Sequence, residues 1–116
     1  MSLDHDWWAQ QKRLALACLS AYEEGATSLE RLADDMGSLS TSFVAQGGEE
    51  VANLSAFLSV SSMEWLNDFE SAAGGIEVVS AVAMDRGWGE LPEEVSVEIQ
   101  ELKKKIRALL DQIPDG

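Results

Sequence analysis

The chain has 116 residues and a formal net charge of -13, from 21 acidic and 8 basic side chains. Its length predicts a single domain spanning residues 1–116, and its 46% hydrophobic content is sufficient for one core. The excess negative charge argues against direct binding to nucleic acid or to an anionic membrane, and it favours either a basic protein partner or a purely solubilising surface.

The first predicted helix runs from about Asp4 to Glu24. The segment KRLALACLSAY (12–22) superficially resembles a signal peptide, but Asp4 and Asp6 precede it and its apolar run is short. We therefore expect an amphipathic helix there. Its apolar stripe consists of residues at helical spacing. The central set is Trp7, Leu14, Cys18 and Tyr22, and a second set that widens it is Trp8, Ala15 and Leu19.

A glycine-containing turn separates the first two helices. Gly25 favours the left-handed cap that ends a helix. Thr27, followed by Glu30 three residues later, matches a capping box and predicts the start of the second helix. We expect that helix to end near Ala45, before Gly47–Gly48. Its apolar residues have the spacing of a helical bundle: Leu29, Leu32, Met36, Leu39 and Phe43.

The third helix follows a segment that the sequence does not define. Residues 49–60 fit either a short helix packed over the bundle or a loop. Ser61 and Glu64 form a second capping box, and the predicted helix then ends at Gly87. Gly74–Gly75 lies inside it, where we interpret the pair as a close approach of a neighbouring helix, with a kink as the alternative. Its core stripe is Trp65, Phe69, Ala72, Ile76, Val79 and Ala83.

The fourth helix is also marked by its ends. Pro92 fits its first turn, Glu93 and Glu94 suit its positive end, and Pro114 stops it. Because no segment shows the sustained alternation of a strand, we predict an all-α fold. The expected form is an antiparallel bundle of four main helices, with a short extra helix at about 49–59 left open. The apolar stripe of the fourth predicted helix consists of Val95, Ile99, Leu102, Ile106, Leu109 and Ile113.

No motif predicts an enzyme. His5 is the only histidine, so the paired ligands of a di-iron bundle do not occur, and neither a calcium loop nor paired cysteines occur. Cys18 lies on an apolar stripe, which predicts a core residue and not a nucleophile. Adjacent carboxylates such as Asp34–Asp35 point about 100° apart on a helix and predict solvated charge. We expect no catalytic residue, no metal and no cofactor.

The acidic residues are concentrated in the middle of the chain. Residues 32–85 contain nine acidic side chains and no basic one. A surface of one sign accelerates encounter with an oppositely charged partner, whereas a merely soluble surface usually mixes both signs. A solvated surface remains the alternative. Our candidate partner-binding residues are Asp34, Asp35, Glu49, Glu50, Asp68 and Glu70. Trp8 or Trp88 either covers an end of the bundle or, exposed beside acids, anchors a contact.

Two segments, LSAYEEGATSLERLADDM (19–36) and WLNDFESAAGGIEVVSAVAMDRG (65–87), resemble a group of bacterial proteins. These are small acidic helical immunity proteins of polymorphic toxin or contact-dependent growth inhibition systems. The resemblance covers about a third of the chain, and residues 37–62 lie outside it. It implies a cytoplasmic, non-catalytic protein that occludes a cognate toxin domain, often a basic nuclease. The residues that carry it are Tyr22, Gly25, Ser28 to Leu32, Trp65, Phe69 and Ala83 to Gly87.

Two other functions stay open. A self-associating structural or assembly protein, such as a homodimer, would pack through apolar surface and exposed tryptophan. An acidic DNA mimic would present regularly spaced carboxylates. No apolar run reaches the roughly 20 residues of a membrane span, and the single cysteine excludes an internal disulfide and fits a reducing cytoplasm.

Overall fold

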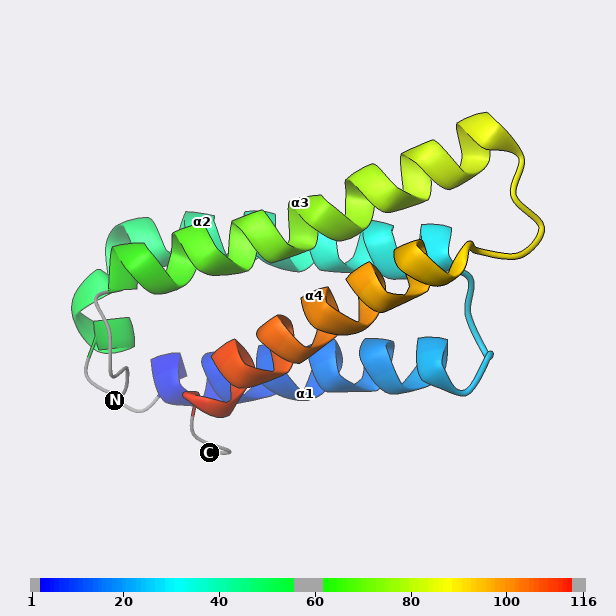
Figure 1. The fold of residues 1–116 in the computed structure, drawn as a ribbon. Helices are drawn as coiled ribbons and strands as arrows, with labels where there is room; N and C mark the ends of the chain where they lie inside the picture. The colour runs from blue at the N-terminus through cyan, green and yellow to red at the C-terminus, as the bar shows by residue number, and fades with distance from the viewer. Residues whose placement is uncertain (1–2, 56–61, 114–116) are drawn as a thin grey trace.

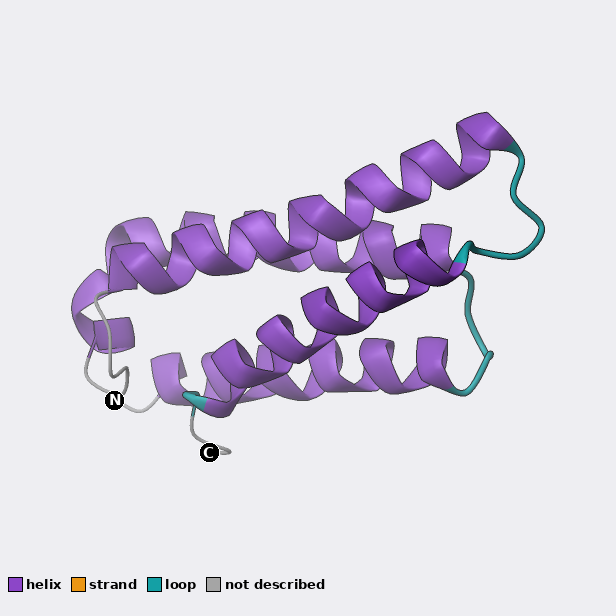
Figure 2. Ribbon diagram, in the orientation of Figure 1, coloured by secondary structure: helices purple, strands orange, loops and turns teal. Residues whose placement is uncertain are grey.

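The protein is an all-α bundle of four helices, as the sequence predicts. The structure, a computed structural model, describes residues 3–55 and 62–113; the side chains of residues 3–6, 44, 46–55 and 62 are not described. The described residues contain no strand (Figure 2). The helices are α1 (Leu3–Glu23), α2 (Leu29–Ser55), α3 (Ser62–Arg86) and α4 (Glu93–Asp111).

Consecutive helices run antiparallel, so the molecule is an elongated bundle of 48 × 24 × 20 Å (Figure 1). The most extensive contact joins α2 to α3, and the least extensive joins α1 to α4. In Figure 1, α2 and α3 form the upper part of the bundle, and α1 and α4 form the lower part. The connections between α1 and α2 and between α3 and α4 therefore lie at the same end.

Two glycines end helices as predicted. Gly25 and Gly87 have φ angles of 77° and 65°, in the left-handed region that other residues avoid. At each, backbone N–H groups bond back to the last turn in the pattern of a Schellman motif. The cap of α2 differs from the prediction by one residue: the Ser28 hydroxyl, not Thr27, accepts a hydrogen bond from the Arg31 N–H at 3.1 Å.

The length of α2 corrects another prediction. We expected the helix to end near Ala45, but it continues through Gly47–Gly48 to Ser55. A glycine weakens a helix by about 1 kcal/mol but does not end it unless the backbone leaves the helical region. Residues 49–55 are consequently part of α2 and not a separate helix or loop, while residues 56–61 and the Ser61 cap lie outside the described residues.

The core confirms the predicted stripes of α2, α3 and α4, whose central residues are buried. The predicted stripe of α1 is confirmed except at Leu14, which is 50% exposed, since Trp8, Ala15 and Leu19 are buried. The stripe also omitted Lys12, which is buried and whose ammonium donates a 2.7 Å hydrogen bond to the carbonyl of Ile113. Its aliphatic chain can then occupy a core position that hydrophobic periodicity assigns to solvent.

An aromatic cluster fills the bundle at the end remote from Gly87. Trp8 stacks on Phe43 with ring centroids 5.1 Å apart, and Trp65 stacks on Phe69 at 5.6 Å. Phe43 also meets Phe69 edge to face at 4.8 Å, which joins the two stacks. Trp7 lies at the margin of the cluster, edge-on to Trp8. Three helices are thereby joined by one set of rings.

The glycine pair inside α3 permits the close approach that the sequence suggested. A Cβ atom added to Gly75 would lie 2.9 Å from Cδ2 of Leu102, on α4. A Cβ atom on Gly74 would meet nothing within 4 Å. Gly75 is therefore the residue at which α4 packs against the backbone of α3.

Candidate functional site

The basic side chains are segregated in the bundle. All eight lie on α1, on α4, in the first turn of α2 or at the end of α3. The segment without bases, residues 32–85, supplies nearly all of α2 and α3. Because these two helices pack directly together, the acids of that segment decorate one pair of helices. The bases are Lys12, Arg13, Arg31, Arg86, Lys103, Lys104, Lys105 and Arg107.

Several basic groups are also used inside the bundle. Arg107 and Lys103 both bond the carboxylate of Glu23, on α1, at 2.6 Å and 3.2 Å. The hydrogen bond from Arg107, followed by that from Lys103, lowers the pKa of Glu23 to about 2. Lys103 is buried and its ammonium also lies 5.5 Å from the centre of the Tyr22 ring. These contacts join α1 to α4, and the two cations share the single negative charge of Glu23.

One of the candidate acids, Glu70, lines a groove between α2 and α3. Glu70 lines a depression of about 340 Å³ together with Ser40, Thr41 and Ala45. Glu77 lies two turns further along α3, and its carboxylate occupies the space that a Cβ atom on Gly37 would need. Asp34 precedes Gly37 by three residues on α2 and so lies on the same helix face. We call Asp34, Glu70 and Glu77 the acidic seam.

Asp35 faces a different groove, between α1 and α2. Its carboxylate pairs with Arg31 at 3.3 Å, and the groove is also lined by Cys18. Burial, together with the charge of Asp35 and a hydrogen bond to it, raises the pKa of the Cys18 thiol. A thiol with a raised pKa is a poor nucleophile, because the thiolate is the reactive form. This groove therefore favours a structural role for Cys18.

The remaining candidates are not brought to the seam by any described contact. Asp68 lines a third groove, between α3 and α4, of about 220 Å³, together with Lys105 and Gln112. Glu49 and Glu50 belong to α2, but their side chains lie outside the described residues. Glu70 thus lines a groove between α2 and α3, Asp34 lies on the α2 face of Gly37 by helical spacing, and Asp35 and Asp68 line other grooves.

Sequence reasoning did not select Glu77, although a signal was present. Glu77 follows Glu70 by seven residues, which is two helical turns, and Gly37 and Thr41 on α2 are small or short residues at helical spacing. A carboxylate can lie across such a face without steric conflict. Only the pairing of α2 with α3 shows that these two patterns face one another.

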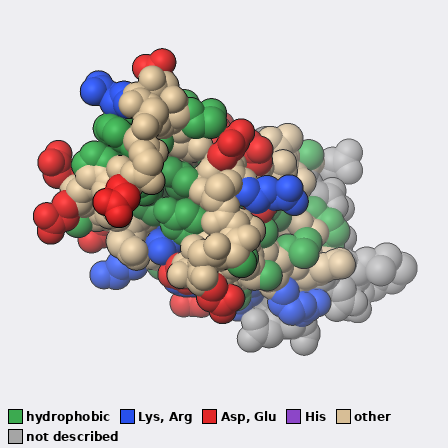
Figure 3. Space-filling model, turned by 90° about the vertical axis from the view of Figure 1, so that its right-hand side faces the viewer, with side chains coloured by type: hydrophobic (Ala, Val, Ile, Leu, Met, Phe, Trp, Pro, Cys, Tyr) green, Lys and Arg blue, Asp and Glu red, His purple; other side chains and the backbone are tan. Residues whose placement is uncertain are grey.

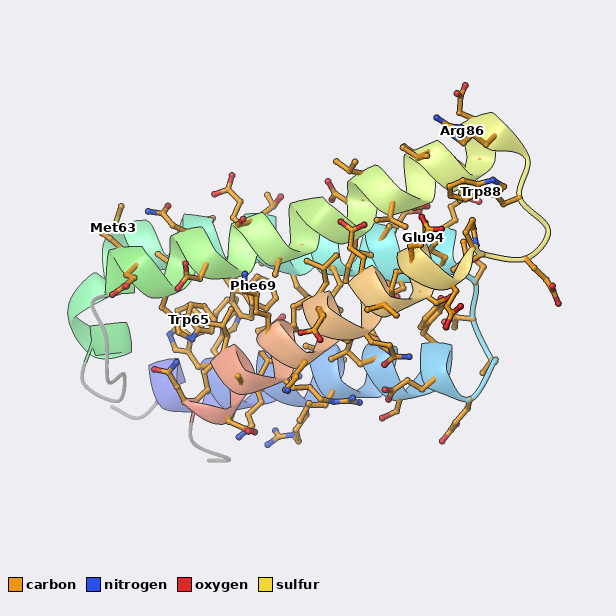
Figure 4. The ribbon with its side chains drawn as sticks, viewed as in Figure 1. Met63, Trp65, Phe69, Arg86, Trp88 and Glu94 are labelled. Atoms are coloured by element: carbon orange, nitrogen blue, oxygen red, sulfur yellow. The ribbon has the colours of Figure 1, made fainter. Side chains whose placement is uncertain are left out.

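The tryptophans divide between core and surface. Trp8 is 1% exposed and belongs to the aromatic cluster at the end remote from Gly87, so it is not an exposed contact anchor. Trp88 is half-buried in the connection between α3 and α4, with the guanidinium of Arg86 5.9 Å from its ring centre. Figure 4 shows its ring directed back beneath the last turn of α3.

The described residues include no group of three His, Cys, Asp or Glu side chains that could hold a metal ion. None of the helices in that same part of the chain has the length and apolar character needed to cross a membrane. No family model matches the chain, and neither the curated proteins nor the solved structures compared with it give a significant match. The resemblance to immunity proteins consequently stays a prediction from the sequence.

Proposed function

We propose that this chain is a non-catalytic binding protein that engages a basic protein partner through the acidic surface of α2 and α3. The observation that carries the proposal is the segregation of charge: residues 32–85 have no base, and all eight cations lie outside that segment. Such a surface attracts a cationic partner over a distance of about 10 Å at moderate salt, and it repels nucleic acid.

The resemblance to immunity proteins gives the proposal its specific form. The protein neutralises a cognate toxin domain, such as a basic nuclease, in the cytoplasm by covering its active site. An inhibitor of this kind needs a rigid scaffold and a complementary surface. The stacked rings of Trp8, Phe43, Trp65 and Phe69 supply rigidity, and the acidic seam supplies charge.

The test begins with a pull-down of the tagged chain from its native lysate at low and high salt, followed by mass spectrometry. We expect a basic partner that is released by salt. If that partner is a toxin domain, its activity should fall to zero at one equivalent of this protein. Recovery of only the chain itself would count against the proposal.

A matched pair of triple variants then tests the surface. One neutralises the acidic seam, with Asp34→Asn, Glu70→Gln and Glu77→Gln. The control neutralises three exposed acids elsewhere, with Glu24→Gln, Glu101→Gln and Asp111→Asn. Both remove the same net charge, so a larger loss of affinity in the seam variant supports a specific surface. Equal losses would show that only total charge matters.

A further inference from the structure

The end of the bundle that carries Trp88 has an unusual concentration of exposed apolar side chains. Among the described residues, six large hydrophobic side chains are exposed, and three of them, Val78, Val82 and Met84, lie in the last turns of α3. Figure 3, which views this end directly, shows hydrophobic side chains at the surface with acidic and some basic side chains around them. An apolar surface of this kind marks an interaction site more often than an isolated apolar residue does.

Two depressions adjoin at Trp88. One, of about 470 Å³, lies between the first turn of α2 and the end of α3, where Leu29, Met84 and Trp88 contribute apolar surface. The other, of about 140 Å³, lies between α3 and α4 and is lined by Val78 and Val82 together with Trp88. One indole thus forms a wall of both depressions.

The backbone fixes the position of this indole. Gly87 adopts its positive φ so that the Trp88 N–H can bond the carbonyl of Ala83 at 3.0 Å, closing the last turn of α3. In this cap the residue after glycine packs against the helix it has just left. Trp88 and Ala83 accordingly line the same depression. The site is built into the end of α3 and does not depend on a long mobile loop.

The charged side chains that line the two depressions are acidic. Glu30 lines the larger one and Glu98 the smaller one, and no Lys or Arg among the described residues lines either, although the guanidinium of Arg86 lies 5.9 Å from the centre of the Trp88 ring. Glu94 stands near Trp88 at the start of α4 (Figure 4). A second copy of this chain would bring its own carboxylates against these, which like-charge repulsion disfavours. Charge complementarity therefore points to a cationic occupant.

We propose that the Trp88 end is an anchor site for a cationic, amphipathic segment of a partner protein, whose apolar side chains enter the two depressions while its lysines and arginines meet the surrounding carboxylates. This deepens the proposed function, because it places the apolar anchor of the same basic partner away from the acidic seam. Apolar anchors in pockets commonly dominate the affinity of an interface, whereas surface charges mainly set the rate of association.

The test uses a synthetic peptide with leucine on one helical face and lysine on the other, titrated into the ¹⁵N-labelled protein. The readout is the indole N–H resonance of Trp88, assigned by its loss in Trp88→Phe. The resonance of Trp65, whose Nε1 donates to the Leu109 carbonyl at 2.8 Å inside the bundle, is the internal control. We expect the Trp88 resonance to shift and the Trp65 resonance to remain in place.

Two control peptides separate the contribution of the apolar side chains to binding from the contribution of the charge. A peptide with glutamine in place of leucine keeps the charge and should not shift Trp88, and one with glutamate in place of lysine keeps the anchors and should not bind. An equal response to either peptide would overturn the proposal. So would self-association of the protein through this end without any peptide.

A matched pair of protein variants locates the site. Val78→Asp and Met63→Asp each replace an exposed apolar residue of α3, at 63% and 59% exposure, and each adds one negative charge. Met63 lies at the opposite end of the helix (Figure 4). The added charge alone would strengthen binding of a cationic peptide. We therefore expect Val78→Asp to weaken binding about tenfold and Met63→Asp not to weaken it; equal effects would refute the site.

This experiment needs no natural partner, so its result can refute the anchor site without refuting the proposed function, and the reverse. A peptide that binds at Trp88, with no basic partner in the lysate, would sustain the anchor site and remove the support for the inhibitor. A salt-sensitive partner that depends on the acidic seam, with no effect of Val78→Asp on it or on the peptide, would sustain the inhibitor and overturn the anchor site.

Discussion

Replacing Glu23 with glutamine should destabilise the bundle by about 2 kcal/mol, because it removes the carboxylate that joins α1 to α4. The fall in the pKa of Glu23 from 4.5 to about 2 would correspond to about 3 kcal/mol without solvent screening. Since 34% of the Glu23 side chain is exposed, screening reduces this contribution to about 1 kcal/mol. The Lys103 side chain is 4% exposed, and its ammonium also loses its anionic partner, which adds about 1 kcal/mol.

The pH dependence gives this prediction its sharper form. Because the pKa of Glu23 is lower in the folded state than the ordinary 4.5, its stabilisation is complete above about pH 4.5 and is lost as the pH falls toward 2. Urea unfolding, followed by circular dichroism, should therefore show a stability gap between the native chain and Glu23→Gln that is full at pH 7 and narrows between pH 4.5 and 2.

Two further variants identify the cause. Glu24→Gln, which removes the adjacent exposed charge, should change the free energy of unfolding by less than about 0.5 kcal/mol. Combining Glu23→Gln with Lys103→Met should be less destabilising than Glu23→Gln alone, since no buried charge is then left unpaired. Equal effects of Glu23→Gln and Glu24→Gln, or parallel pH curves, would refute the reasoning.

Three other predictions concern the packing of the bundle, each measured by urea unfolding. Gly74→Ala should stabilise the protein by about 1 kcal/mol, whereas Gly75→Ala should gain less because its Cβ meets Leu102 at 2.9 Å; equal gains would contradict the close approach of α4. Trp65→Phe should cost about 2 kcal/mol, because it removes the 2.8 Å hydrogen bond to α4 and leaves a void, and a change below about 0.5 kcal/mol would count against this contact. Gly87→Ala should cost about 1 kcal/mol because of its φ of 65°, and the variant should shift the indole resonance of Trp88; an unchanged resonance would show that the cap does not position the ring.

The sequence predicts the fold well where apolar spacing is uninterrupted. The stripes of α2, α3 and α4 follow the spacing of a bundle through residues such as Met36, Ile76 and Ile106, all fully buried. The stripe of α1 is correct at Trp8 and Leu19 but omits Lys12, whose burial depends on the carbonyl of Ile113, far away in the sequence. No local pattern contains that information.

The site was less predictable, because helix pairing decides which groove a side chain faces. Asp35 lines the groove with Cys18, whereas helical spacing places the adjacent Asp34 on the α2 face of Gly37, which Glu77 covers. The rotation of about 100° per residue predicts their separation but not the destination of each. Glu77 joins the seam only because α3 packs antiparallel to α2 at Gly37.

The charge distribution is more specific than solubility requires. The helices with the least extensive contact, α1 and α4, are joined by Lys103 and Arg107 to Glu23, and Lys12 of α1 bonds Ile113, just after the end of α4. The helices with the most extensive contact, α2 and α3, are held by apolar and aromatic packing and can carry a surface without bases. The acids that repel one another thus lie on the two helices with the strongest packing, and that packing can offset their repulsion. A chain selected only for solubility has no need of this division, whereas a binding surface for a cationic partner does, because each base among its acids would weaken the field.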